Sequence, residues 1–120
     1  MAIVKPILLS ASSMSGFKVY DTERKDIGDI KDLMLDMGTG RIAYAVLSFG
    51  GFLGFGDKLF AIPFKALMLD PKKESFVLNI SKEKLEQSRG FDKSNWPDMA
   101  DSEWAAELHE YYDHKPFWQE

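Results

Sequence analysis

Hydrophobic and polar positions in the middle third of the chain alternate in the manner of strands joined by tight turns. In Gly28–Asp36, strict alternation would put Ile30 and Leu33 on opposite faces. A one-residue β-bulge near Asp32 would return both side chains to the core, so we predict a bulge there. The next strand, Arg41–Phe49, is apolar on both faces, which predicts a central strand that is covered on each side.

Shorter apolar runs flank this hairpin and are separated by glycine, proline or charged turns. Many short strands at regular spacing indicate a small barrel or sandwich. We therefore predict a mostly β fold, a small closed or partly open antiparallel β-barrel over residues 1–80. The expected flanking segments are a strand or its lead-in at Ile3–Leu9, a turn or one helical turn at Ser10–Gly16, a strand at Phe17–Tyr20, a charged surface turn at Asp21–Asp26, and strands at Lys58–Pro63, Ala66–Leu69 and Phe76–Ile80.

The pattern changes after residue 80, where strand-like alternation gives way to helical spacing. Ser81 is suited to cap a short helix that runs through Ser88, with Gly90 ending it. Asp101 or Ser102 is suited to cap a last helix, in which Trp104, Leu108 and Tyr111 recur at helical spacing. We predict that residues 81–120 form a short, aromatic-rich helical tail that packs on the barrel or on a partner.

Composition narrows the range of functions. The 120 residues carry a formal net charge of -4, which argues against direct nucleic-acid binding, because that affinity comes largely from clustered lysine and arginine. The absence of cysteine excludes disulfides and thiolate metal sites and is typical of a reducing cytoplasm. No apolar run approaches the roughly 18 residues of a membrane span, and Lys5 and Pro6 interrupt the apolar start of the chain. We expect a cytoplasmic protein with no transmembrane segment.

The glycine-rich connection Gly50–Asp57 resembles the opening of a phosphate-binding loop, because four residues separate Gly51 from Gly56. Asp57, however, stands where that motif needs a lysine, and its carboxylate would repel a phosphate. The expected role of these glycines is to let a strand connection bend. We predict no cofactor.

Other candidate chemistry is equally weak. His109 and His114 are one residue too far apart for the zinc-protease helix motif, so we predict a solvated helix end. Carboxylates around the hairpin are typical of turns and strand edges, although two that converged beside a cleft would form an acid–base pair or a metal site. No nucleophile-elbow pattern surrounds any of the N-terminal serines. The sequence predicts no catalytic residue and no metal site; the residues considered are Asp29, Asp32, Asp36, Asp57, Ser10, Ser12, Ser13 and Ser15.

Aromatic residues supply the best candidates for a binding surface, since aromatic side chains dominate protein–protein hot spots. Those in the glycine-rich connection either pack within the protein or protrude as an apolar patch that a partner, including a second copy, covers. In the tail, we expect Trp96 and Trp104 to pack on the barrel, and both packing and partner binding stay open for the last two aromatics. The candidate interaction surface is Phe52, Leu53, Phe55, Phe117 and Trp118.

The segments IGDIKDLMLD (residues 27–36) and YAVLSFGGFLGFGDKLFAIPFKAL (residues 44–67), with Gly40 in the turn, closely resemble the PRC-barrel domain. The resemblance covers roughly Leu8 to Ile80. The chain as a whole resembles the free-standing bacterial type of the family. This family takes its name from the cytoplasmic barrel of the photosynthetic reaction centre H subunit and includes the C-terminal domain of a ribosome maturation factor. The resemblance implies an interaction platform without shared catalytic residues, in which the matching positions are structural: Gly28, Asp36, Gly40, Gly51, Gly54, Gly56 and Pro63.

Three functional hypotheses follow from these patterns. The leading hypothesis is a non-enzymatic adaptor that binds an unidentified protein partner and forms homo-oligomers. The second is a factor for ribosome or RNA-processing assembly that acts through a ribosomal protein. The third is a small-ligand binder or enzyme that uses the barrel mouth.

Overall fold

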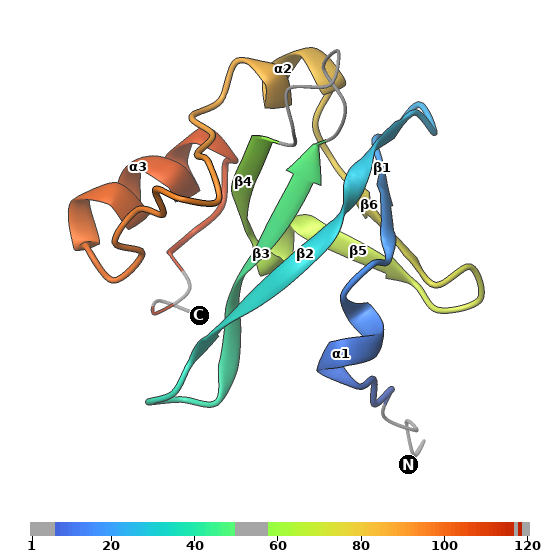
Figure 1. Ribbon diagram of the computed structural model, residues 1–120, viewed down its shortest axis with the longest axis horizontal. Helices are drawn as coiled ribbons and strands as arrows, with labels where there is room; N and C mark the ends of the chain where they lie inside the picture. Colours follow the sequence, from blue (N-terminus) through green and yellow to red (C-terminus); the bar gives the residue numbers. More distant parts are fainter. Residues whose placement is uncertain (1–6, 50–57, 117, 119–120) are drawn as a thin grey trace.

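The structure is a computed structural model that describes residues 7–49, 58–116 and 118. Most of its regular structure is β-strand, and helices occur at the N-terminal side and after the last strand (Figure 1). The elements are α1 (Ala11–Met14), β1 (Lys18–Tyr20), β2 (Asp26–Asp36), β3 (Arg41–Phe49), β4 (Lys58–Pro63), the 3-10 helix η1 (Phe64–Ala66), β5 (Leu67–Asp70), β6 (Ser75–Leu78), α2 (Lys82–Glu86) and α3 (Ser102–Tyr111).

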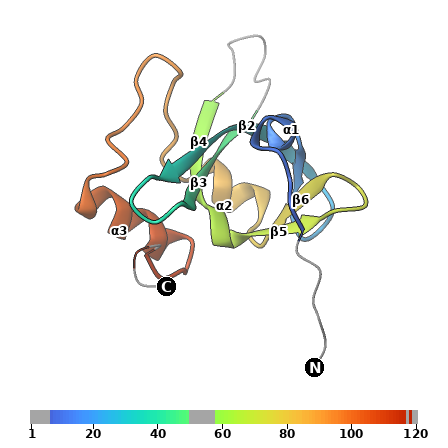
Figure 2. The ribbon, with the colours of Figure 1, turned by 90° about the horizontal axis from the view of Figure 1, so that it is seen from below.

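The strands form one curled six-stranded sheet in the order β4-β3-β2-β1-β6-β5 (Figures 1 and 2). Within the described residues the two outer strands do not pair with each other, so the barrel is partly open. The predicted mostly β, partly open barrel is confirmed. The expectation of purely antiparallel pairing is wrong for one pair, because β1 runs parallel to β6. Alternating burial shows which face of a strand is covered but carries no information about the direction of its neighbour.

The hairpin of β2 and β3 contains the predicted bulge. The pairing shifts between Ile30 and Asp32, so Lys31 is the extra residue and both Ile30 and Leu33 turn toward the core. A second shift follows between Met34 and Leu35. These irregularities bend β2 and help the sheet to curl.

Asp36 organises the turn of this hairpin. Its carboxylate accepts hydrogen bonds from the Gly38 amide, at 3.0 Å, and from the Thr39 hydroxyl, at 2.8 Å. Gly40 closes the turn with a φ of +77°, a left-handed conformation that favours glycine. This acid is therefore engaged in the backbone of the turn.

The core fills the concave side of the sheet. Phe76 lies 6.0 Å from both Phe17 and Phe64, measured between ring centroids. The tail contributes to the same cluster through Leu85 and Tyr112, both of which are buried there. The helices after residue 80 therefore pack on the barrel of their own chain.

The opposite face of β3 packs against α3, which lies beside β4 and β3 in Figure 1. Tyr44 contacts Trp104 and His109 there, with ring centroids 5.5 Å apart in each case. Coverage on both faces of β3 is thus confirmed. The prediction that His109 lies on a solvated helix end is wrong, because its side chain is buried and its Nδ1 lies 2.7 Å from the Ala105 carbonyl oxygen.

Of the segment Ile3–Leu9, expected as a strand or its lead-in, only residues 7–9 are described, and they form no strand. Two smaller expectations need correction. Asp21, expected in an exposed turn, is buried. Its carboxylate tolerates burial because it accepts hydrogen bonds from the Glu23 and Lys25 amides. The helix at residue 82 ends at Glu86, well before Gly90.

Among the described residues, no helix combines the length and apolar character needed to cross a membrane.

Candidate functional site

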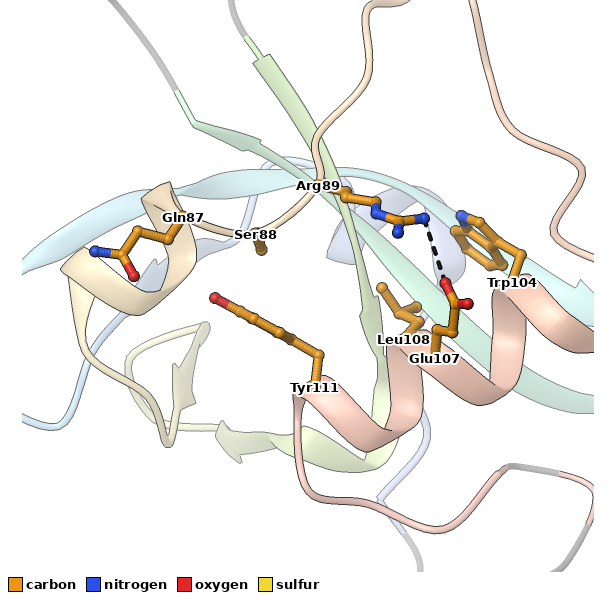
Figure 3. Close-up of a pocket in the computed structure, with 7 residues that line it drawn as sticks. All are labelled: Gln87, Ser88, Arg89, Trp104, Glu107, Leu108 and Tyr111. Atoms are coloured by element: carbon orange, nitrogen blue, oxygen red, sulfur yellow. Dashed lines mark ion pairs between the residues drawn. The ribbon is translucent and has the colours of Figure 1, made fainter.

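A groove of about 370 Å³ lies between the end of α2 and α3, and we call it the interhelical groove. Trp104, Leu108 and Tyr111 project into it from successive turns of α3 (Figure 3). Gln87, Ser88 and Arg89, which follow α2, form the opposite wall. The groove thus joins two tail segments that are about twenty residues apart in the sequence.

Local sequence signals position both walls. The Ser81 hydroxyl accepts a hydrogen bond from the Lys84 amide at 3.1 Å and caps α2. The Asp101 carboxylate caps α3 by accepting from the Glu103 amide at 3.1 Å. Both caps agree with the sequence prediction. In α3, the groove residues recur at spacings of four and three, which place them on one helix face.

The floor of the groove is anchored from beneath. Trp104 packs edge-to-face on Tyr44, and Leu108 packs against the buried cores on both sides of β3. Tyr111 reaches across to α2, where its hydroxyl donates to the Lys84 carbonyl oxygen. The Lys84 ammonium also lies 5.1 Å from the centre of the Tyr111 ring, a cation–π distance. These contacts hold the apolar floor in one shape.

The rim of the groove carries opposite charges on its two sides. Arg89 and Glu107 pair across it at 3.3 Å, and both side chains are mostly exposed (Figure 3). These two are the charged residues of the groove lining. Outside the lining, Glu103 and Glu110 continue the exposed stripe of Glu107 along α3, and Lys84 lies on α2. An exposed ion pair contributes at most about 1 kcal/mol to folding, so exchanging this pair for contacts with a partner would cost the fold little.

Tyr112 lies beneath the groove, next to the residue Ser88 that lines it. Its hydroxyl donates to the Ser88 Oγ at 3.5 Å, and the Ser88 hydroxyl donates to the Leu85 carbonyl oxygen at 2.6 Å. Burial raises the pKa of the Tyr112 phenol to about 12. Burial also raises the pKa of Tyr44. Both phenols are therefore held in their neutral form by the fold.

The raised pKa of Tyr112 predicts a stability loss in alkali. Below pH 10 the phenol is protonated in both states, and above pH 10 it ionises more readily in the unfolded chain, so stability falls as pH rises toward 12. Tyr112→Phe removes this loss. Between pH 8 and pH 11, the free energy of unfolding of the variant should therefore rise relative to that of wild type by about 1.4 kcal/mol. Urea denaturation at pH 8, 9, 10 and 11 measures the difference, and parallel curves for both proteins would contradict the prediction.

A second hollow, of about 350 Å³, lies at the other side of the barrel and is lined entirely by apolar residues. Its lining includes Phe76 from the core, Leu67 and Leu69 from β5, and residues Ile7, Leu8 and Leu9 before α1. Sequence reasoning associated these N-terminal residues with a strand and did not foresee this hollow.

The other residues singled out in the sequence do not converge on a site. Asp36 caps its turn, and the Asp32 carboxylate accepts from the Leu33 amide. Within the described residues, no group of three or more histidine or acidic side chains is arranged to hold a metal ion. Phe52, Leu53, Phe55, Asp57, Phe117 and the glycines Gly51, Gly54 and Gly56 lie outside the described residues.

The remaining predicted positions have clear surroundings. Trp118 is 47% exposed and its ring lies 5.9 Å from that of His109. Trp96 stacks edge-on against Phe91 at 5.2 Å. Gly28 has a φ of +128° and lies against β3, and Pro63 ends β4.

Sequence reasoning missed the interhelical groove. The spacing of Trp104, Leu108 and Tyr111 was visible, and so was the parallel stripe of glutamates in α3. What was not visible was that Arg89 and Lys84 face this helix, because that depends on how the irregular segment 91–100 brings the two helices together.

Among solved structures, a proposed 16S ribosomal RNA processing protein, RimM, from Pseudomonas aeruginosa matches this chain with 19% sequence identity and a TM-score of 0.43. The match covers 62% of this chain and 45% of that protein, so this chain corresponds to less than half of its length. A comparison with curated proteins found no match. The family model of the PRC-barrel domain matches residues 6–85, which is most of the chain and includes every strand of the sheet. The chain therefore belongs to the PRC-barrel domain family.

Proposed function

We propose that this protein is a non-enzymatic adaptor that binds a partner protein through the interhelical groove. The observation that carries the proposal is the combination of an anchored apolar floor with oppositely charged sides. Tryptophan, tyrosine and arginine are the residue types that contribute most to binding at protein interfaces, and the groove presents one of each.

The partner that suits this groove is an amphipathic helix. Its apolar stripe would lie on Trp104, Leu108 and Tyr111, in the manner of helix-in-groove recognition. Its acidic side would face Lys84 and Arg89, and its basic side would face the glutamates of α3. Such charge complementarity gives orientation and specificity more than affinity.

The chemistry of the groove supports a binding role over catalysis. The two charged side chains of its lining, Arg89 and Glu107, pair with each other at the rim, where water surrounds them. A general acid or base is usually tuned by burial or by a specific neighbour in a cleft. We place this function in the cytoplasm, as the cysteine-free composition suggests.

Photocrosslinking in the native cytoplasm tests the proposal. A photoreactive amino acid at Gln87, in the groove wall, should give one dominant crosslinked protein, whose attached peptide is an amphipathic helix. The same group at Lys72, in the turn after β5, is the matched control and should not capture that protein. Equal capture from both positions would contradict groove binding.

Charge reversal then tests recognition. Arg89→Glu or Glu107→Arg should lower the affinity for the captured partner by at least roughly tenfold, because like charges are brought together. The double variant R89E/E107R restores the ion pair but reverses its polarity, so it should fold like wild type and still bind weakly. Full binding by the double variant would show that the partner does not use these charges. Recovery only of ribosomal particles, through a contact with a ribosomal protein that resists nuclease treatment, would favour the ribosome-assembly alternative.

A further inference from the structure

The two edges of the sheet are protected differently. At the β4 edge, the segment after α2 pairs with the strand: the Leu59 amide donates to the Phe91 carbonyl oxygen at 2.9 Å, and the Phe91 amide donates back at 2.8 Å. A side chain at Gly90 would collide with this edge, which shows how closely the segment approaches. Pro63 ends the strand. The β4 edge is thus covered.

At the β5 edge, none of the described segments pairs with the strand from outside. In the part of the chain that the structure describes, β5 pairs only with β6, through Leu67–Leu78 to Asp70–Ser75. Edge strands are normally protected by charged side chains, proline, a bulge or a very short length. β5 is short, at four residues, but Leu67, Met68 and Leu69 are uncharged, the strand contains no proline, and its register with β6 has no shift; Asp70 is its one charged residue.

Exposed apolar side chains surround this edge. Met68 is 66% exposed, and Ile7 and Leu8, which line the same hollow as Leu67 and Leu69, are 62% and 87% exposed. In Figure 2 the described residues just before α1 lie close to β5. We call Ile7, Leu8, Leu9, Leu67, Met68 and Leu69 the apolar margin. Such a cluster is typical of a surface that another protein covers.

We propose that β5 pairs antiparallel with β5 of a second copy of this chain, so that two sheets join across the apolar margin. A two-fold axis normal to the sheet and passing through Met68 puts Met68 opposite its counterpart. On the other face of the strand, Leu67 then lies opposite Leu69 of the second copy, and Leu69 opposite Leu67. All three central pairs are apolar, and cross-strand pairs of this kind stabilise antiparallel sheets.

Self-complementarity is what identifies the partner as a second copy. Moving the axis to Leu69 would put Leu67 opposite Pro71, which has no amide hydrogen to donate, and Met68 opposite Asp70. Moving it to Leu67 would put Lys65 opposite Leu69. Only the register centred on Met68 keeps the three pairs apolar, and an isologous two-fold contact requires such a register.

The interface is short, since each strand contributes four residues. Small interfaces bind weakly, so we expect a dissociation constant in the micromolar range at about neutral pH. The inference concerns a surface other than the interhelical groove and holds whether or not the groove binds a partner.

Sedimentation velocity of the full chain over a wide concentration range tests the proposal. Met68→Lys places two ammonium groups opposite each other across the axis, and Met68→Glu does the same with carboxylates. Each variant alone should raise the dimer dissociation constant by at least about tenfold, which corresponds to about 1.4 kcal/mol. Mixing the two variants should restore a heterodimer, because opposite charges then face each other. A folding defect cannot produce that rescue.

Met37→Lys is the matched control, because Met37 is also an exposed methionine, 84% against 66% for Met68, and lies in the β2–β3 turn. This variant should dimerise like wild type. A single cysteine at Met68, in a chain that otherwise has none, should give a covalent dimer with a short bis-maleimide, whereas one at Met37 should not. A wild-type chain that stays monomeric at millimolar concentration would overturn the proposal. Equal behaviour of the Met68 and Met37 variants would overturn it as well.

Discussion

Gly28→Ala should lower the free energy of unfolding by about 4 kcal/mol, a large share of the roughly 5–15 kcal/mol that stabilises a domain. A Cβ atom at this position would lie 2.2 Å from the Ser48 carbonyl oxygen and 3.2 Å from the Leu47 side chain. Both belong to β3, whose two faces are covered, so neither can move aside without disturbing the core. The φ of +128° adds conformational strain for any residue with a side chain.

Gly40→Ala separates the two contributions. Gly40 has a φ of +77°, but a Cβ atom there would meet nothing within 4 Å. We therefore expect only the conformational cost, about 1–2 kcal/mol. Urea denaturation of both variants measures the difference. If Gly28→Ala costs no more than Gly40→Ala, β2 can shift away from β3 and the close approach is not essential.

Leu85→Ala should cost about 2–5 kcal/mol, the range for removing a large aliphatic side chain from a packed core. Leu85 lies on α2 and is fully buried in the same cluster as the interior strands. The lost contacts are those that link the tail to the barrel. The helical segment therefore contributes to the stability of the folded domain.

The exposed neighbour Glu86 supplies the control, since Glu86→Ala should change stability by no more than about 0.5 kcal/mol. The loss in Leu85→Ala should also be the same at low and high protein concentration, because the contact is within one chain. A loss that vanishes on dilution would instead mean that the tail docks on a neighbouring molecule.

Helix caps and the bulge show what local pattern reveals. Ser81 and Asp101 were predictable as caps because their side chains need only reach an amide two or three residues away. The bulge was predictable because two apolar positions, Ile30 and Leu33, were out of phase in one strand. In each case the constraint acts over a few residues.

His109 shows where such reasoning stops. At the end of a helix rich in charged residues it was expected in water, yet Tyr44 and Ala105 enclose it. The same holds for β1 and β6, whose parallel pairing depends on the path of all the strands between them. Burial of a polar ring and the direction of a neighbouring strand are decided by segments far away in the sequence.

The strands β1 to β6, the turn at Asp36, the caps of both tail helices and the resemblance to the PRC-barrel domain could all be read from the sequence. These follow from backbone geometry and from burial patterns that repeat every two or about 3.6 residues. Two features required the fold: Arg89 faces Glu107, and β5 is an edge strand that pairs only with β6 among the described residues. Both depend on which distant segments pack together, and a residue's pattern along the chain records its own burial but not the identity of its neighbours.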